Sequence, residues 1–246
     1  TPSIKNTLDY IILGSELLPD ALGCPEEKTY LFLFENNTEL RPAGGFIGSY
    51  GVLRVKDGTL EEFTTSGVYK IDRGVVTGIP TPKPMQQYNR VYDWAFRDSN
   101  WSPDFAVSAK KAEWFYKIQG GKEQFDGVIA ITPDFLSSLI KLTGPIKISG
   151  YPYTFTSENF IDELEYHVEI NYKKLGINSR QRKDILNDLS FEIIRKVLEL
   201  PKERIGDLIR IIKEELDRKQ ILLYFHNEKI ADIIKEQNWS GEVKIA

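Results

Sequence analysis

Residues 30–55 read YLFLFENNTELRPAGGFIGSYGVLRV, and this segment anchors the predicted sheet. It opens with the apolar and aromatic run 30–34, which is typical of a strand buried on both faces. A polar segment and the pair Gly44-Gly45 follow, and a second strand is predicted over residues 46–55. Glycines beside a polar strand end allow a ligand to approach the backbone, so we interpret this connection as a binding rim.

Three further strands are predicted along the chain. Residues 59–65 form a hairpin with the strand before them, because Lys56-Asp57-Gly58 is a strong turn signal. Residues 125–131 and 220–224 are apolar runs of strand length, and capped amphipathic helices separate them from the hairpin. The pattern predicts an α/β (α+β) fold with a central mixed sheet flanked by helices.

Two helix starts carry similar residues. Ser102 is expected to be an N-cap with a proline after it, and Thr132 is expected to cap a second helix in the same way. A helix is also predicted over residues 86–96, and residues 67–84, rich in glycine and proline, are expected to form a long surface loop.

The chain is expected to form one domain over residues 1–246. An N-terminal helix lies within residues 1–25, the sheet core with the ligand rim within 29–150, and a helical part that returns to the sheet within 151–246. Apolar stripes along 186–197 and 205–216 indicate helices whose faces pack in the core. The helices of 158–217 are therefore expected to pack on the sheet.

Composition excludes several classes of protein. The formal net charge is −4 and no long run of one sign occurs, which argues against a general nucleic-acid binder. Cys24 is the only cysteine, so neither an intramolecular disulfide nor a cysteine-rich zinc site can form. His167 and His226 are too far apart in sequence for a histidine-rich metal centre, and no phosphate-binding or serine-nucleophile motif is present.

The remaining chemistry lies in arginine, amide and carboxylate side chains near predicted strand ends and helix starts. Arginine binds phosphate through paired hydrogen bonds, and carboxylates can hold Mg²⁺ or accept a proton. We assign catalytic roles to Arg41, Arg97 and Asp98. Ligand-binding roles are assigned to Glu35, Asn36, Asn37, Arg73, Asn100 and Ser102.

Arg41 and Arg97 are expected to converge on one anionic pocket over the helix start at Ser102. The alternative is that each arginine forms a structural ion pair, Arg41 with Glu39 or Glu35, and Arg97 with Asp98. The polar connection after residue 34 is also compatible with a turn of solvated charges.

Four segments together resemble a bacterial domain family of unknown function whose members are membrane-anchored and exported. They are NNTELRPAGGFIGSYG, RDSNWSPDFAVSAKKAEWFY, FDGVIAITPDFLSSLIKLTGPI and KQILLYFHNEKIADIIKEQNWSGEV. The resemblance spans nearly the whole chain. It implies an extracytoplasmic location, with membrane attachment through a segment outside this chain.

That family in turn is distantly similar to the LytR–CpsA–Psr phosphotransferases, which move glycopolymers from polyprenyl-pyrophosphate carriers onto the cell wall. Arg41 and the small residues after it resemble the first arginine motif of those enzymes, R-S-D-T, with Ala43 where the motif has aspartate. Residues 71–74, Ile-Asp-Arg-Gly, resemble their P-R-D motif, with Gly74 in place of aspartate.

The resemblance implies a cell-envelope protein that binds a polyprenyl-phosphate or glycopolymer-phosphate ligand and can transfer a glycopolymer to the cell wall. The alternative is a non-catalytic envelope binding or scaffold domain on the same fold. Because the aspartates of both motifs are replaced, we assign no cofactor to the protein. We also expect weak or no Mg²⁺ binding in the absence of a ligand. A bound pyrophosphate could complete a Mg²⁺ site with Asp98 or Glu35.

Overall fold

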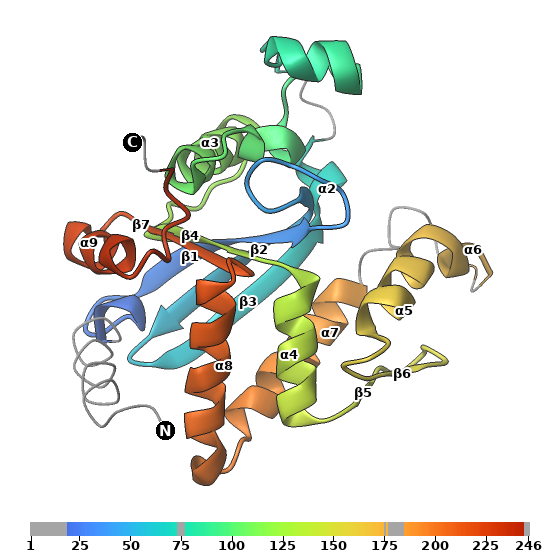
Figure 1. Ribbon diagram of the computed structural model, residues 1–246, viewed down its shortest axis with the longest axis vertical. Helices are drawn as coiled ribbons and strands as arrows, with labels where there is room; N and C mark the ends of the chain where they lie inside the picture. The colour runs from blue at the N-terminus through green and yellow to red at the C-terminus, as the bar shows by residue number, and fades with distance from the viewer. Residues whose placement is uncertain (1–18, 73–76, 175, 177–184, 244–246) are drawn as a thin grey trace.

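A computed structural model describes residues 19–72, 77–174, 176 and 185–243, and Figure 1 shows a central sheet with helices on both faces. The sheet has five strands in the order β3-β2-β1-β4-β7. β1 and β4 are parallel, while the other neighbouring pairs are antiparallel. The predicted mixed sheet flanked by helices is confirmed.

The strands lie where the apolar runs predict them. They are β1 (Lys28–Asn36), β2 (Phe46–Lys56), β3 (Thr59–Gly67), β4 (Gly127–Ile131) and β7 (Ile221–Phe225). Asp57 and Gly58 connect β2 to β3 with φ angles of 49° and 75°. Two successive residues with positive φ form the tight turn that matches strand twist, so the predicted hairpin is confirmed.

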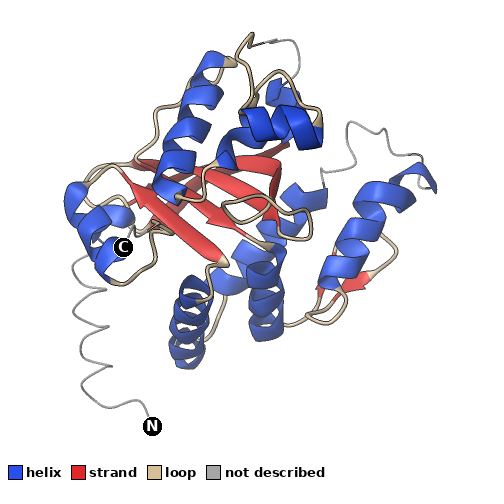
Figure 2. Ribbon diagram, turned by 45° about the horizontal axis from the view of Figure 1, so that its top comes forward, coloured by secondary structure: helices blue, strands red, loops and turns tan. Residues whose placement is uncertain are grey.

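Helices cover the two faces of the sheet (Figure 2). The helices and helical turns are α2 (Val68–Asp72), η1 (Met85–Asn89), η2 (Phe96–Trp101), α3 (Phe105–Ile118), α4 (Pro133–Thr143), α5 (Phe160–Tyr166), η3 (His167–Asn171), α6 (Tyr172–Lys174), α7 (Ile185–Leu198), η4 (Lys202–Arg204), α8 (Ile205–Asp217) and α9 (Glu228–Glu236). A small hairpin of β5 (Ile146–Lys147) and β6 (Thr154–Phe155) lies outside the main sheet.

Each face of the sheet has its own hydrophobic core. On one face, α2, η2 and α3 contribute side chains such as Val68, Phe96 and Phe115. On the other face, α4, α5, α7 and α9 contribute side chains such as Ile140, Phe160 and Ile193. In the helical region after residue 157, α7 contacts β3 and α8 contacts β7.

Several predicted local elements differ from the structure. The predicted helix over 86–96 is wrong, because only the single turn η1 forms before an irregular segment. The predicted loop over 67–84 is wrong at its start, where β3 runs directly into α2. Ile205 and Ile209, assigned to a core stripe, are 46% and 57% exposed. Residues 1–18, which include most of the range given for the N-terminal helix, and Arg73 lie outside the described residues.

Candidate functional site

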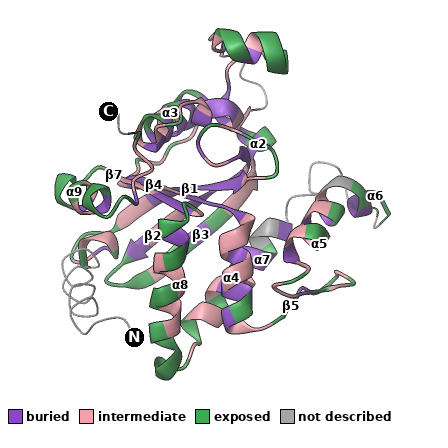
Figure 3. Ribbon diagram, viewed as in Figure 1, coloured by how far each residue is buried: buried purple, intermediate pink, exposed green. Residues whose placement is uncertain are grey.

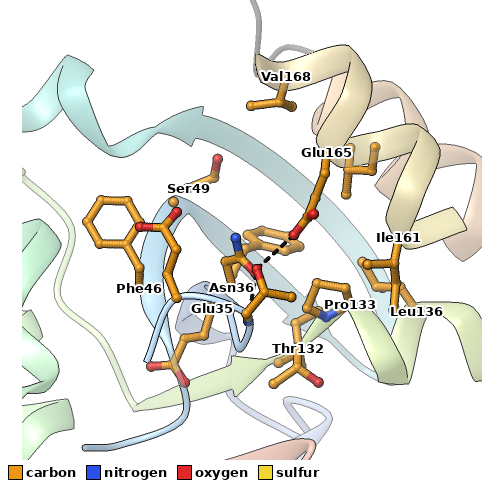
Figure 4. A pocket seen from close by; sticks show the side chains of 16 residues that line it. Glu35, Asn36, Phe46, Ser49, Thr132, Pro133, Leu136, Ile161, Glu165 and Val168 are labelled. Carbon is orange, nitrogen blue, oxygen red and sulfur yellow. Dashed lines mark hydrogen bonds between the residues drawn. The ribbon is translucent and has the colours of Figure 1, made fainter. Parts of the chain in front are cut away.

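A pocket of about 280 Å³ opens at the ends of the parallel strands β1 and β4. Figure 4 shows Ile161 and Val168 on the wall opposite Phe46. Parallel strands end at the same edge of a sheet, and in α/β proteins this edge is a common ligand site. The lining is mostly apolar and consists of Phe34, Glu35, Asn36, Thr38, Glu39, Phe46, Gly48, Ser49, Ile131, Thr132, Pro133, Leu136, Ile161, Leu164, Glu165 and Val168.

Glu35 is a buried carboxyl group in the pocket wall. Its Oε1 atom accepts a hydrogen bond from Nδ2 of Asn100 at 3.0 Å. Burial raises the pKa of Glu35 well above 4.5, although the bond from Asn100 acts in the opposite direction. Glu35 is therefore a buried polar group of the wall whose protonated form is favoured by burial.

Asn36 and Asn37 fix the connection after β1. Oδ1 of Asn36 accepts a hydrogen bond from the backbone N–H of Thr38 at 3.0 Å, which forms a local turn. Nδ2 of Asn37 donates to Oδ2 of Asp134 at 2.5 Å and ties the connection to α4. The structure thus places both asparagines in bonds within the protein.

Asn100 fastens the glycine segment to the end of β1. It is fully buried, and its Nδ2 lies 2.6 Å from the carbonyl oxygen of Gly45 and 3.3 Å from that of Ala43. A Cβ atom on Gly44 would lie 1.9 Å from Oε2 of Glu35, and one on Gly45 would lie 2.2 Å from the carbonyl oxygen of Asn36. The two glycines therefore allow close packing within the protein, which corrects the idea that they serve ligand approach.

Arg41 and Arg97 share one buried carboxylate. Nε of Arg41 lies 3.7 Å from Oδ1 of Asp98, and Nε of Arg97 lies 3.3 Å from Oδ2 of the same group. Nη1 of Arg97 also donates to Oδ2 of Asp72 at 3.0 Å. The arginines come together as expected, but each has a carboxylate partner, and the partner of Arg41 is Asp98 rather than Glu39 or Glu35.

The two aspartates of this cluster differ in their bonding. Asp72 also accepts hydrogen bonds from the backbone N–H of Phe96 at 3.1 Å and from Nε2 of Gln119 at 2.9 Å. Burial raises the pKa of Asp98, while the nearby charges of Arg97 and Arg41 act to lower it. Asp72 is therefore fully occupied within the fold, whereas Asp98 depends on the two arginines.

Unsatisfied polar atoms occur in the arginine cluster, in the residues next to Asp98 and in the pocket wall at Ser49. Buried side-chain atoms without a hydrogen-bond partner include Arg41 Nε, Ser49 Oγ, Asp98 Oδ2, Ser99 Oγ and Asn100 Oδ1. Buried polar atoms in folded proteins normally have a partner, so such a concentration indicates a place where a polar ligand or water binds.

The helix start near Ser102 is not an open anion site. Asp104, not Ser102, is the N-cap of α3, and its side chain accepts a hydrogen bond from the N–H of Val107. The N–H of Phe105 donates to the carbonyl oxygen of Gly241 at 3.1 Å. The predicted N-cap role of Ser102 is wrong, since Asp104 caps the helix, and a distant carbonyl group accepts from the N–H of Phe105.

Sequence reasoning missed the far wall of the pocket. Ile161, Leu164, Glu165 and Val168 come from α5 and η3, more than a hundred residues after β1. No local pattern marks them as ligand contacts, because their apolar spacing is that of any helix packed on a sheet. Thr132, expected only as an N-cap, occupies that position but makes no capping bond, and it lines the pocket.

Within the described residues, no cluster of three or more histidine, cysteine, aspartate or glutamate side chains is arranged to hold a metal ion. In the same part of the chain, no helix combines the length and the apolar character needed to cross a membrane.

Comparisons with solved structures give weak overall likenesses. Protein gbs0355 from Streptococcus agalactiae is 14% identical, with a TM-score of 0.49, over 87% of this chain and 74% of that chain. Lin1025 from Listeria innocua is 10% identical, with a TM-score of 0.46, over 87% of this chain and 79% of that chain. A transcriptional regulator, EF0465, from Enterococcus faecalis is 14% identical, with a TM-score of 0.42, over 87% of this chain and 72% of that chain. None of these likenesses bears on function.

No curated protein matches the chain. A family model does match, over residues 25–168, which is more than half of the 246 residues and includes β1 to β4, the pocket and the arginine cluster. That model is described as "Protein of unknown function (DUF4012)", and the chain therefore belongs to the DUF4012 family.

Proposed function

We propose that this domain binds an anionic amphiphile of the polyprenyl-phosphate type, with the hydrocarbon chain in the pocket and the phosphate at Arg41. In this proposal the protein acts extracytoplasmically at the bacterial cell envelope, on a fold akin to that of the LytR–CpsA–Psr phosphotransferases. Its ligand is a polyprenyl-linked glycan phosphate or a related cell-wall precursor.

The observation that carries the proposal is the position of Phe46. Its side chain lines the apolar pocket, and the guanidinium carbon of Arg41 lies 5.1 Å from its ring centroid. An apolar cavity and a cationic group are thus adjacent, with one aromatic ring between them. This arrangement suits a ligand with a hydrocarbon tail and a charged head.

The phosphate belongs on the Arg41 side of Phe46. Glu39 and Glu165 line the pocket, and no described arginine or lysine does, so an anion inside the pocket would meet these two acidic side chains. Nε of Arg41 has no hydrogen-bond acceptor, and the side chain keeps 17% of its surface exposed. Nε is buried and faces Asp98, so a phosphate would meet the exposed part of this side chain and gain a charge-assisted interaction with the guanidinium group there.

The pocket volume limits the length of chain that it can enclose. A cavity of about 150 Å³ holds one benzene molecule, which has six carbons. By proportion, the 280 Å³ of this pocket corresponds to roughly eleven carbons. A ten-carbon geranyl chain should fill it, and longer polyprenyl chains should extend beyond its mouth.

Binding without transfer is the form of this function that the geometry favours. Asp72 directs both carboxylate oxygens to donors within the fold, and Asp98 faces two guanidinium groups. These aspartates do not fit the role of Mg²⁺ ligands while the arginine pairs are formed.

The proposal is tested by calorimetric titration with geranyl phosphate and with uncharged geraniol. Ile161→Trp fills the pocket from a partly exposed wall and should weaken the binding of both ligands at least tenfold. Ile209→Trp, on the exposed face of α8, should change neither affinity. Arg41→Ala should weaken only geranyl phosphate, by about 1.5–3 kcal/mol, the range for a hydrogen bond to a charged group. If the wild-type protein binds neither ligand, or if Ile161→Trp leaves both affinities unchanged, the proposal is wrong.

A further inference from the structure

The segment of residues 77–94 forms an ordered arm that stands above α3, away from the sheet (Figure 1). We name it the arm. Its two sides are joined near the base, where the N–H of Trp94 donates to the carbonyl oxygen of Ile79 at 2.8 Å. Oδ1 of Asp93 accepts hydrogen bonds from Thr77 Oγ1 at 3.0 Å and from the N–H of Gly78 at 2.9 Å. The only acidic residue of the arm is therefore occupied at its base.

The tip of the arm is also held in one shape. Met85 and Thr81 are buried, and Nε2 of Gln86 donates to the carbonyl oxygen of Thr81 at 2.6 Å. The turn η1 ends at Arg90, which has a positive φ of 54°. Because the backbone is fixed by these bonds, docking of the tip would order few additional groups.

The tip presents aromatic rings and cations together. Tyr88 and Tyr92 are 77% and 67% exposed, and Lys83 and Arg90 are exposed beside them. Residues 77–92 contain these two cations and no acidic residue, in a chain whose net charge is −4. Figure 3 shows the segment above α3 as mostly exposed.

The same chemistry continues onto α3 at the base of the arm. Nζ of Lys111 lies 5.0 Å from the ring centroid of Trp94 and 4.5 Å from that of Trp114, which is itself exposed. Lys110 and Lys117 are exposed on the same helix, and its one acidic residue, Glu113, pairs with His226 at 2.9 Å. The arm and this helix thus form one surface rich in exposed aromatic and basic side chains.

We propose that the tip of the arm docks onto an anionic lipid bilayer at the level of the headgroups. Tyrosine and tryptophan favour that level because their rings are apolar with a polar edge, and lysine and arginine are attracted to anionic headgroups. A surface that binds only a soluble polyanion would need the cations but not two largely exposed tyrosines. This inference does not depend on the pocket or on its ligand.

The experiment is co-sedimentation with vesicles of phosphatidylcholine alone and of phosphatidylcholine with 30% phosphatidylglycerol. The wild-type domain should bind only the anionic vesicles and should be released by high salt. Lys83→Ala/Arg90→Ala should lower the partition coefficient roughly 25-fold, from about 1 kcal/mol per charge near the surface. Tyr88→Ala/Tyr92→Ala should lower it on the order of tenfold, as expected for partial burial of two rings.

A matched double variant, Phe191→Ala/Lys202→Ala, removes an exposed ring and an exposed cation from α7 and η4 and should bind as the wild type does. Equal losses in this control and in the arm variants would overturn the proposal, as would equal binding to neutral vesicles. If the tyrosine variant binds as the wild type while the charge variant does not, the surface is a polyanion site and the bilayer proposal is wrong. Titration of the arm variants with geranyl phosphate should match the wild type, which separates this test from that of the pocket.

Discussion

Asn100→Ala should destabilise the protein strongly, although Asn100 contributes no charge and little volume. Its Nδ2 group carries two hydrogens, and the two shortest contacts are 2.6 Å to the carbonyl oxygen of Gly45 and 3.0 Å to Oε1 of Glu35. Alanine leaves both acceptors buried without this donor. At about 1–3 kcal/mol for each buried polar group left unpaired, the unfolding free energy should fall by about 2–6 kcal/mol.

The measurement is urea denaturation followed by circular dichroism, with a thermal melt as a second reading. For a chain of this size about 2–4 °C of melting temperature corresponds to each kcal/mol, so a loss of about 4 kcal/mol lowers the melting temperature by about 8–16 °C. Asn89→Ala, on the exposed turn η1, is the control and should stay within about 0.5 kcal/mol of the wild type. A loss below about 1 kcal/mol for Asn100→Ala would refute the reasoning that this amide holds the glycine segment to β1.

Three other variants test the buried groups around the pocket. Burial raises the pKa of Glu35 in the folded protein, so the unfolded chain releases this proton first and the free energy of unfolding decreases as pH rises above 4.5. Glu35→Gln should therefore have the same urea midpoint as the wild type near pH 4 and a higher midpoint at pH 7. Burial lowers the pKa of His167 below 6.5, so the unfolded chain takes up a proton first and the free energy of unfolding falls as pH drops below 6.5. In His167→Gln the urea midpoint should depend less on pH in this range. Gly44→Ala should cost more than Gly58→Ala in urea denaturation, because both glycines have positive φ but only at Gly44 does the new methyl group meet a buried side chain. Equal losses at the two glycines would count against close packing with Glu35.

The sheet was predictable because its signals are local. Each apolar run of strand length can be recognised from its own residues. The Asp57-Gly58 turn then fixes the pairing of β2 with β3 and its register. The order of β1, β4 and β7 depends on pairings between distant segments, and no single segment carries that information.

The arginine cluster was predictable only in part. Arg41 and Arg97 both lie at the ends of predicted elements, and this position predicted that they are close in space. Their ion-pair partners could not be predicted, because they depend on where η2 places Asp98 and on the hydrogen bonds of Asp72. Ser102 and Asp104 are both good N-caps by residue type, and the choice between them was open in sequence terms. In the structure Asp104 also accepts a hydrogen bond from the N–H of Val243, a contact that local sequence cannot supply.

Phe46 has a consequence for the energetics of any ligand that spans both sides of its ring. Since the ring is part of the pocket wall and also packs against the guanidinium group of Arg41, a chain that shifts the ring changes the surroundings of the arginine. Coupling between two binding events is reciprocal, so whatever the chain does to headgroup affinity, the headgroup must do to chain affinity. The effects of Ile161→Trp and Arg41→Ala on ligand affinity should then be non-additive in a double-mutant cycle. The interaction energy measures how strongly the Phe46 ring couples binding of the chain to binding of the headgroup.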